Sequence, residues 1–404
     1  MVDTETLKKQ VLEESEKIFP EFKKLKDKIG ENPELGSEEE ESSKLLVDAL
    51  KKHGFEVEYP FFEMHTAFKA VYKGKEPGPV IAILAEYDAL PGVGHGCGHN
   101  IIGTSGVGAG IATSKLMKDL PGEIWVIGTP AEEGHGPYGG SKVRMAQEGV
   151  FDGVDVSYMI HPATGLSQAQ GNFLAVTGTE ITFKGKTAHA AADAHSGANA
   201  LNAAMITYMS IHANRQQLRR DANPVIHGII KEGGLASNII PDRAVLQMGI
   251  RSSDDSYLPT MLDMVMNSAK GAALATGCEV EFKTGMGLKS NIPLRSLEKL
   301  FTEIWDELGH QYMDPVDVAI QPPGGSTDFC DVSHVVPGIH PMIGITQEEM
   351  PMHSVQFADC TMTEKGDEGL KTAIKTMAIA AVKLINEPDL LKEIKAEFEE
   401  KRLK

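Results

Sequence analysis

The sequence predicts an α/β protein in which a large domain is interrupted by a smaller inserted domain. Apolar runs of strand length, such as Val80–Ala85, alternate with helical stretches over the first 160 residues, a pattern typical of a sheet covered on both faces. After about Thr177 the predicted order becomes β-α-β-β-α-β, which is that of a ferredoxin-like sandwich. The length of 404 residues also favours two domains over a single core.

The N-terminal region is predicted to be helical. Apolar residues recur at helical spacing between residues 5 and 30, and Asn32-Pro33 ends this amphipathic helix. Ser37 heads a second helix that has acidic residues in its first turn and stops at Gly54. A short alternating strand is expected at residues 55–59.

Three continuous apolar runs follow, each with the length of a buried strand. They begin at Val80, Ile124 and Val156. Helices are expected at residues 103–117 and 141–148, so strands and helices alternate through this region.

The inserted domain is expected at residues 179–286, between the two parts of the large domain at 1–178 and 287–404. Its predicted strands are 180–184, 225–231, 243–251 and 279–283, and its predicted helices are 197–218 and 258–275. In the second part of the large domain, the sequence predicts a helix after Pro293, a strand at 338–345, and helices at 364–384 and 390–404.

Composition excludes several classes of partner. The formal net charge of −18 argues against nucleic acid and anionic membranes. The four cysteines show no repeated close spacing, which favours a reducing compartment over a disulfide framework. The N-terminus has no apolar signal region and no apolar run is long enough to span a membrane, so a cytoplasmic protein is expected.

Side chains with metal-binding chemistry stand at the predicted strand ends. In chain order these residues are Asp88, Cys97, His99, Glu132, Glu133, His161 and His353. Sites in open α/β sheets form beyond the carboxyl ends of the strands, so we expect these side chains to converge. A mixture of thiolate, imidazole and carboxylate donors suits zinc, with cobalt or manganese as alternatives.

This list is long enough for two metal ions, which together can share a hydroxide and polarise the carbonyl that it attacks. The adjacent glutamates 132 and 133 suggest a division of labour in which one binds metal and the other moves protons. Each residue alone has an ordinary interpretation: Cys97 as a small buried residue, His161 as a satisfied histidine, the glutamates as solvated carboxylates. Their combination at strand ends favours the metal site.

At this point the sequence resembles the co-catalytic metallopeptidases that include aminoacylase, glutamate carboxypeptidase, hippurate hydrolase and the plant auxin-conjugate amidohydrolases. It is most similar to the branch of p-aminobenzoyl-glutamate hydrolase and the cytosolic β-alanyl-lysine-type dipeptidases. The resemblance covers nearly the whole chain. Its motifs are Asn-Pro-Glu-Leu-Gly near residue 32, Glu86-Tyr-Asp-Ala-Leu-Pro, Gly-His-Gly-Cys-Gly-His-Asn, Gly-Thr-Pro-Ala-Glu-Glu-Gly, Gly185-Lys-Thr-Ala-His-Ala, Ser237-Asn-Ile-Ile-Pro-Asp, Gly325-Ser-Thr-Asp-Phe and His353-Ser with Phe357.

The resemblance implies an α/β, mixed-sheet, zinc-peptidase-like catalytic domain that holds two divalent metal ions, with the insertion as a lid and dimerisation domain. It implies roles for the strand-end residues as follows: metal ligands Cys97, His99, Glu133, His161 and His353, general base Glu132, and ligand-orienting carboxylate Asp88.

The resemblance also implies roles for residues of the insertion. The histidine that matches His189 reaches the other protomer's site in this family and stabilises the tetrahedral oxyanion. Asn238 and Arg251 would grip the carboxylate of the substrate. Without the resemblance, His189 is typical of an exposed loop and Arg251 of a surface charge.

Several positions depart from the family pattern. Ala194 stands where proline is frequent, the run that contains His135 and Tyr138 differs from the usual glycine-rich segment, and Cys330 replaces a common glycine. None of these changes removes a predicted ligand or the base. They leave the substrate preference open, and with it the roles of His135, Tyr138 and Cys330.

We therefore expect a cytoplasmic, homodimeric, dinuclear metal amidohydrolase that cleaves an N-acyl amino acid or a dipeptide next to a free carboxylate. A metal-bridging hydroxide would be the nucleophile and Glu132 the general base. Two alternatives remain open: a metal-dependent C–N hydrolase or deaminase of a non-peptide small molecule, and a non-catalytic relative that binds small molecules. The sequence leaves undetermined the acyl group, the amino acid, the physiological metal and any need for a second type of chain.

Overall fold

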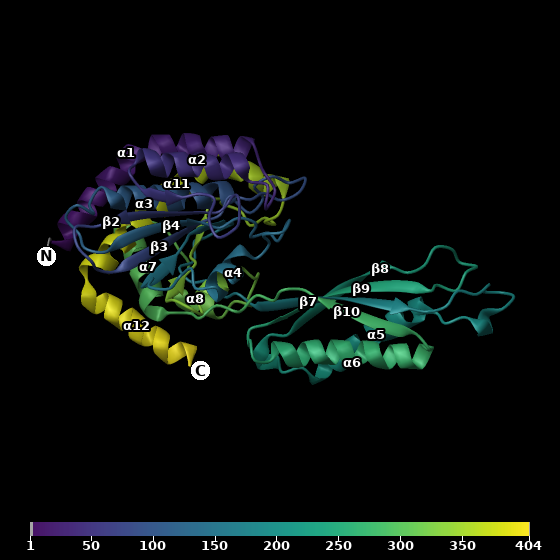
Figure 1. Ribbon diagram of the computed structural model, residues 1–404. Helices are drawn as coiled ribbons and strands as arrows, with labels where there is room; N and C mark the ends of the chain where they lie inside the picture. Colours follow the sequence, from purple (N-terminus) through teal and green to yellow (C-terminus); the bar gives the residue numbers. More distant parts are fainter. Residues whose placement is uncertain (1–2, 404) are drawn as a thin grey trace. The chain divides into compact units, whose positions relative to one another are not determined.

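The computed structural model describes residues 3–403, and this part of the chain divides into two compact units. Unit 1 holds the chain up to Asn172, Asn291–Pro322 and the chain from Thr327 on, and unit 2 holds Phe173–Ser290 and Pro323–Ser326. Figure 1 shows helices on both sides of the central sheet of unit 1 and helices on one side of the sheet of unit 2. Among the described residues, no helix is both long and apolar enough to cross a membrane.

The central sheet of unit 1 is mixed, as predicted. Its strands in spatial order are β1 (Glu56–Glu58), β2 (Phe68–Lys73), β4 (Glu123–Gly128), β3 (Val80–Ala85), β5 (Val156–Tyr158) and β11 (Gly338–Ile339). Strands β4, β3, β5 and β11 are parallel, whereas β2 pairs antiparallel with β4 and β1 antiparallel with β2. The carboxyl ends of the parallel strands therefore share one edge of the sheet.

Strand β3 lies at the centre of the core because both of its faces are covered. Ile81 and Ile83 pack in the larger apolar cluster, with α1 (Thr4–Glu31), α3 (His99–Ser114) and α11 (Glu364–Asn386). The alternate residues Ala82 and Leu84 pack in a second cluster, with α4 (Ser141–Gln147) and α9 (Phe329–Val332). A strand whose side chains are apolar on both faces explains the uninterrupted apolar run.

Helix α3 packs directly against β3 and places its first residue beside the end of that strand. A Cβ atom at Gly106 would lie 2.7 Å from the carbonyl oxygen of Leu84, and one at Gly103 would lie 2.6 Å from that of Glu86. Only glycine allows an approach this close. His99, at the start of the helix, is thereby held next to the residues that follow β3.

Unit 1 contains further elements outside the central sheet. They are α2 (Glu40–Lys52), β6 (His161–Ala163), α7 (Arg295–Leu308), α8 (Pro315–Ala319), β12 (Met342–Gly344), α10 (Val355–Cys360) and α12 (Pro388–Arg402). Strands β6 and β12 pair in parallel as a separate two-stranded sheet.

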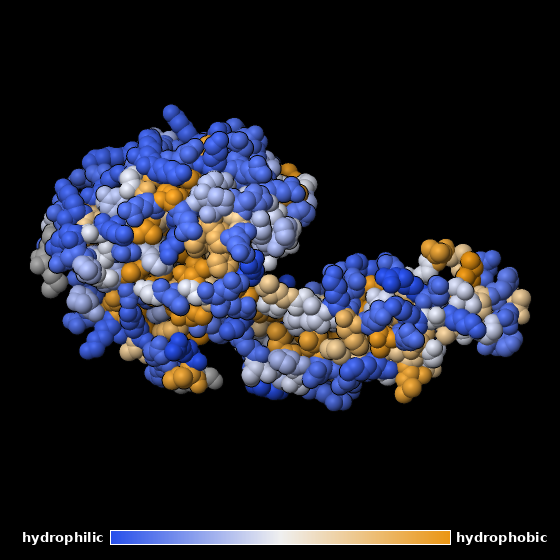
Figure 2. All heavy atoms as spheres, viewed as in Figure 1, coloured by the Kyte–Doolittle hydropathy of each residue, from blue (hydrophilic) through white to orange (hydrophobic). Residues whose placement is uncertain are grey.

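Unit 2 is a four-stranded antiparallel sheet with two helices on one face. Its elements in chain order are β7 (Ala175–Lys184), α5 (Ala200–Asn214), β8 (Val225–Glu232), β9 (Arg243–Ser252), α6 (Leu258–Thr276) and β10 (Glu279–Thr284). The spatial order is β10-β7-β9-β8, so β8 and β10 are edge strands. Short 3₁₀ turns lie at Ala194–Ser196, Arg215–Gln217 and Arg220–Ala222. Figure 2 shows hydrophobic side chains at the surface of this unit.

Some predicted boundaries were wrong. Helix α3 begins at His99 rather than at residue 103, because Gly98 turns the chain with φ of +79° directly into the helix. The apolar run 338–345 is two strands in different sheets, interrupted at Pro341, which has no N–H to donate to a ladder. Strand β2 and helix α10 were not predicted, and β7 begins at Ala175 rather than at residue 180.

Candidate metal centre

The predicted metal-binding residues of unit 1 all follow strands at one edge of the structure. Asp88 comes after β3, the two glutamates 132 and 133 come after β4, and His161 begins β6 directly after β5. His353 lies in the loop between β12 and α10. This edge is where side chains from parallel strands converge in open sheets.

Cys97 lies in a tight loop that is hydrogen-bonded to the separate segment containing His353. The backbone N–H of His353 donates to the carbonyl of Gly96 at 2.8 Å. A Cβ atom at Gly96 would lie 2.6 Å from Cγ1 of Val93 and 3.3 Å from Cα of His353, so glycine is needed for this contact. Two segments 256 residues apart in the sequence are thereby joined.

The donor atoms of these residues lie close together. The sulfur of Cys97 is 3.4 Å from Nε2 of His161 and 3.3 Å from Nε2 of His353. Oε1 of Glu133 is 3.6 Å from Nε2 of His353 and 4.0 Å from Nε2 of His99. The structure therefore brings together all five residues that the resemblance named as ligands.

The five residues form two triads that share one member. Cys97, His99 and His161 make up the first, and Cys97, Glu133 and His353 the second, with the ligand atoms of each triad within 4.8 Å of one another. Glu132 belongs to a further group with His99 and Glu133. Two neighbouring groups with a common thiol match what a pair of metal ions requires.

Two buried atoms at the centre support this interpretation. Nε2 of His99 and Oε1 of Glu133 have no hydrogen-bond partner among the described residues. Buried polar atoms are normally satisfied, so such atoms need a ligand. Nitrogen, sulfur and carboxylate donors together fit a divalent transition metal. Burial raises the pKa of the Cys97 thiol, and a bound cation would reverse this by favouring the thiolate.

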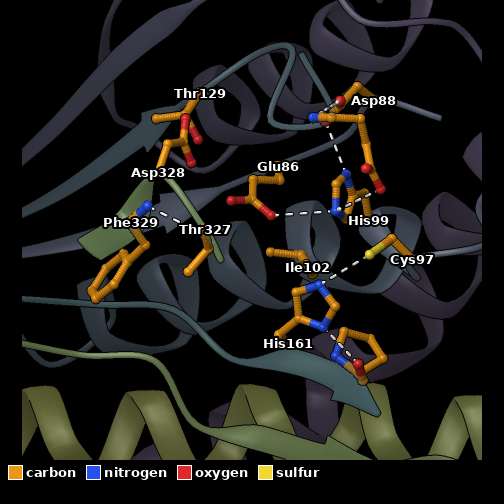
Figure 3. A network of polar contacts seen from close by, with 12 residues as sticks. Glu86, Asp88, Cys97, His99, Ile102, Thr129, His161, Thr327, Asp328 and Phe329 are labelled. Carbon is orange, nitrogen blue, oxygen red and sulfur yellow. Dashed lines mark hydrogen bonds and ion pairs between the residues drawn. The ribbon is translucent and has the colours of Figure 1, made fainter. Parts of the chain in front are cut away.

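Asp88 fixes the orientation of the His99 ring. Its Oδ1 lies 2.8 Å from Nδ1 of His99, which leaves Nε2 of that ring facing the donor cluster (Figure 3). Burial alone would raise the pKa of Asp88, but the charge and hydrogen bond of His99 lower it. Burial alone would lower the pKa of His99, but Asp88 raises it well above its usual value. Similarly, Nδ1 of His161 lies 2.6 Å from the carbonyl oxygen of Pro162, so its Nε2 faces Cys97.

Glu132 lies beside further acidic groups that the sequence did not single out as site residues. Its carboxylate oxygen lies within 4.8 Å of those of Glu86 and Asp328. Burial and then the charges of these two neighbours raise the pKa of Glu132 well above its usual value. The fully buried Lys142 lies between Glu86 and Asp328, at 2.7 and 2.5 Å from their oxygens. Glu86 and Asp328 occur within the motifs quoted above, whereas Lys142 carries no sequence signal.

Glu39 is a second buried group that the sequence did not reveal. Its Oε1 accepts a hydrogen bond of 2.8 Å from the backbone N–H of Ala131, the residue before Glu132, and Ala131 has φ of +58°. Its Oε2 accepts from Thr66 Oγ1 at 3.0 Å. Burial, together with the charge of Asp88, raises the pKa of Glu39 to about 7. Glu39 thus fixes the strained backbone that presents the two glutamates.

The three predicted residues of the insertion lie in unit 2. The exposed residues His189 and Asn238 lie in adjacent segments, since the N–H of Ala190 donates to the carbonyl of Asn238 at 3.0 Å. Nδ1 of His189 accepts from the N–H of Ala192 at 3.1 Å. Arg251 is half-buried and donates from Nη1 to Oγ of Ser326 at 2.8 Å.

The residues that depart from the family pattern have structural partners. The hydroxyl of Tyr138 lies 2.8 Å from Nδ1 of His65, and the carbonyl of His135 accepts a hydrogen bond from Ser37 at 3.0 Å. Cys330 is fully buried in α9. His135, Tyr138 and Cys330 lie outside the groups of possible metal ligands among the described residues.

A protein-family model and several curated proteins match most of the chain. The model of peptidase family M20/M25/M40 matches residues 82–381. The human Xaa-Arg dipeptidase is 33% identical over 390 residues, covering 92% of this chain and 87% of its own. One of the chains of p-aminobenzoyl-glutamate hydrolase from Escherichia coli K12 is 28% identical over 447 residues, covering 93% of this chain and 91% of its own.

Solved structures share the fold. The YXEP protein of Bacillus subtilis, a dinuclear metal-binding peptidase, has a TM-score of 0.69 at 24% identity and covers 92% of this chain and 99% of its own. The aminobenzoyl-glutamate utilization protein of Klebsiella pneumoniae has a TM-score of 0.73 at 20% identity and covers 94% and 99%.

Proposed function

Since the chain belongs to peptidase family M20/M25/M40 and is a metal-dependent hydrolase of amide or peptide bonds, we propose that the bond it cleaves lies next to a free carboxylate. The substrate would be a dipeptide or an N-acyl or N-aroyl amino acid. The names of the relatives support this class, because one is a dipeptidase and another a hydrolase of an aroyl-glutamate.

The observation that carries the metal dependence of this hydrolysis is the pair of donor triads that share Cys97. Cys97, His99, Glu133, His161 and His353 would hold two divalent ions, with zinc favoured by the sulfur and nitrogen donors and manganese or cobalt as alternatives. When bound, such a pair lowers the pKa of a water molecule and polarises the carbonyl of the substrate.

Glu132 would move the proton. Its carboxylate lies within 4.8 Å of the donor atoms of His99 and Glu133, yet it belongs to neither of the two triads. It would accept a proton from water and deliver it to the leaving amine, as a general base and then a general acid. The neighbouring acidic groups, which make its protonated form accessible, support this role.

Unit 2 would serve as a ferredoxin-like lid and dimerisation domain. Asn238 and Arg251 would bind the substrate carboxylate, and His189 of one copy would stabilise the oxyanion in the other copy. The edge strand β8 supports the dimer, because its residues Val225, Ile229 and Ile230 are 40%, 59% and 43% exposed. An exposed apolar edge is suited to pairing with the same strand of a second copy.

The protein would act in the cytoplasm. Cys97, Cys278 and Cys360 are free thiols, which is the state expected in a reducing compartment. Cys97 in particular must stay reduced to serve as a metal ligand.

Metal content and activity, measured on the same sample, test the proposed function. Plasma mass spectrometry should find about two divalent metal ions per chain. Hydrolysis of a panel of dipeptides and N-acyl amino acids should disappear on chelation and return on refilling with zinc, manganese or cobalt. Release of ammonia rather than an amino acid would instead indicate a deaminase. Absence of both metal and activity after loading would indicate a binding protein.

A further inference from the structure

Lys142 lies in the interior of unit 1, although it is the second residue of helix α4. Its side chain is fully buried, and its ammonium nitrogen lies 2.7 Å from Oε1 of Glu86 and 2.5 Å from Oδ1 of Asp328. The backbone N–H of Lys142 also donates to Oδ2 of Asp328 at 3.3 Å. Carboxylates therefore fix both the side chain and the backbone of Lys142.

Glu132 adds a third carboxylate to this group. One oxygen from each of Glu86, Glu132 and Asp328 lies within 4.8 Å of the others. Carboxylate oxygens at this spacing are suited to bind a divalent cation, zinc included. Here the charge of the lysine occupies the same place in the fold, because its nitrogen contacts two of the three carboxylates.

The oxygen cluster and the donor triads are neighbours. Oε2 of Glu86 lies 3.5 Å from Nε2 of His99, a predicted metal ligand (Figure 3). Glu132 takes part in both groups, since it is also within 4.8 Å of the donor atoms of His99 and Glu133. A change in the charge of the oxygen cluster therefore acts directly on Glu132, the residue proposed to move protons.

We propose that Lys142 is a positioning residue that acts as a built-in cation: it occupies the cluster of Glu86, Glu132 and Asp328, excludes a third divalent ion, and so leaves Glu132 free to carry protons. This role rests on the function proposed above for Glu132. Without the ammonium, three carboxylates would face one another, two of them fully buried, a state that is relieved by capturing a cation or a proton.

The test compares Lys142→Met with a matched control, Lys26→Met. Lys26 is also a fully buried lysine of unit 1, and it contacts Asp367 at 2.6 Å and Asp27 at 2.9 Å. Both substitutions remove a buried ammonium that is paired with two carboxylates. Lys26 contacts none of the donor residues, so its loss reports the effect on folding alone.

Both variants and the wild type are equilibrated with excess zinc and freed of unbound metal, and zinc per chain is then measured. We expect the wild type and Lys26→Met to hold the same amount and Lys142→Met to hold about one ion more. Turnover of Lys142→Met should fall at least about tenfold with KM changed less than about twofold, because Glu132 is engaged by the extra ion. Zinc content equal to that of the wild type in folded Lys142→Met overturns the proposal, whatever its activity.

A second variant decides the question if Lys142→Met does not fold. The double variant Lys142→Met/Asp328→Asn removes one charge of each sign and leaves Glu86 and Glu132 without an ammonium. Its turnover should be inhibited by zinc at concentrations that do not affect the wild type, and equal sensitivity overturns the proposal. Zinc content is read independently of turnover, so an inactive wild type would refute the proposed function without deciding the role of Lys142.

Discussion

The carboxylate of Asp88 joins His99 to the segment that carries Glu133. Its Oδ1 lies 2.8 Å from Nδ1 of His99, and its Oδ2 accepts a hydrogen bond of 3.0 Å from the backbone N–H of Glu133. One buried side chain thus orients two of the proposed ligands, which come from different strand ends. Both contacts require an oxygen that accepts, because each partner donates.

Asp88→Asn should therefore weaken metal binding. The amide offers one acceptor and one donor, so either His99 or the N–H of Glu133 would face a second donor. We expect metal affinity to fall about 10- to 100-fold, as is typical when a residue that orients a ligand is changed. Competition with a chromogenic chelator measures this affinity.

Asp155→Asn is the matched control for Asp88→Asn. Asp155 accepts a hydrogen bond of 2.7 Å from the N–H of Val80, at the opposite end of strand β3. This variant removes the same charge from a side chain that also accepts a backbone hydrogen bond and that pairs with Lys395, and its metal affinity should equal that of the wild type. Equal affinity in Asp88→Asn would show that the carboxylate does not orient the ligands.

Glu132→Gln should separate catalysis from metal binding. Glu132 lies outside both donor triads, so the variant is expected to keep the wild-type metal content. Its turnover should fall about 10²- to 10⁴-fold, because the amide cannot accept the proton. Glu133→Gln, one residue away, should lose metal instead. Substantial turnover in Glu132→Gln would exclude Glu132 as the proton carrier.

The strand-end residues could be predicted because their position follows from local patterns. Apolar runs marked β3, β4 and β5, and polar residues directly after them had to lie at one sheet edge. His353 could be placed with them because it follows the apolar run 338–345, although its neighbour in the structure, Cys97, is 256 residues away in the sequence.

Residues that act through distant partners carry no such pattern. Lys142 follows two glycines and a serine and is typical of a solvated helix start, yet its partner Asp328 lies 186 residues away in the sequence. Glu39 is one of several consecutive acidic residues, and its contact with Ala131 spans 92 residues. Burial of these charges depends on the packing of elements that a local pattern does not place together.

Mixing inactive variants tests whether His189 acts on the other copy. In a hybrid of His189→Ala and Glu132→Gln, one site would combine an intact Glu132 with an intact His189 from the second chain. Random pairing should then restore about a quarter of the wild-type activity, because half of the dimers are hybrids with one working site each. The hybrid of Glu132→Gln and Glu133→Gln should stay inactive. If no activity returns in the first mixture, His189 works within its own chain or not at all.

Helix α7 begins without a cap of its own, and Glu397 of α12 supplies one. The preceding residue, Leu294, offers no side-chain acceptor. The carboxylate of Glu397 instead accepts from the N–H groups of Arg295 and Ser296, each at 2.9 Å, and pairs with Lys401 at 2.8 Å. Burial alone would raise the pKa of Glu397, but the contacts with Lys401, Ser296 and Arg295 lower it from 4.5 to about 2.

Glu397→Gln should consequently destabilise unit 1 in a pH-dependent way. A carboxyl whose pKa is lowered by folding adds stability above its unfolded pKa and loses it as the pH falls through the folded value. The full shift corresponds to about 3 kcal/mol, and partial exposure reduces the expected loss near pH 7 to about 1–2 kcal/mol. Below pH 4.5 the wild type and the variant should converge, because the wild-type carboxylate becomes protonated toward pH 2. Unfolding midpoints measured from pH 7 to pH 3 show this convergence, with exposed Glu399→Gln on the same helix as the unaffected control. A difference that stays constant across this range would mean that Glu397 acts through shape rather than charge.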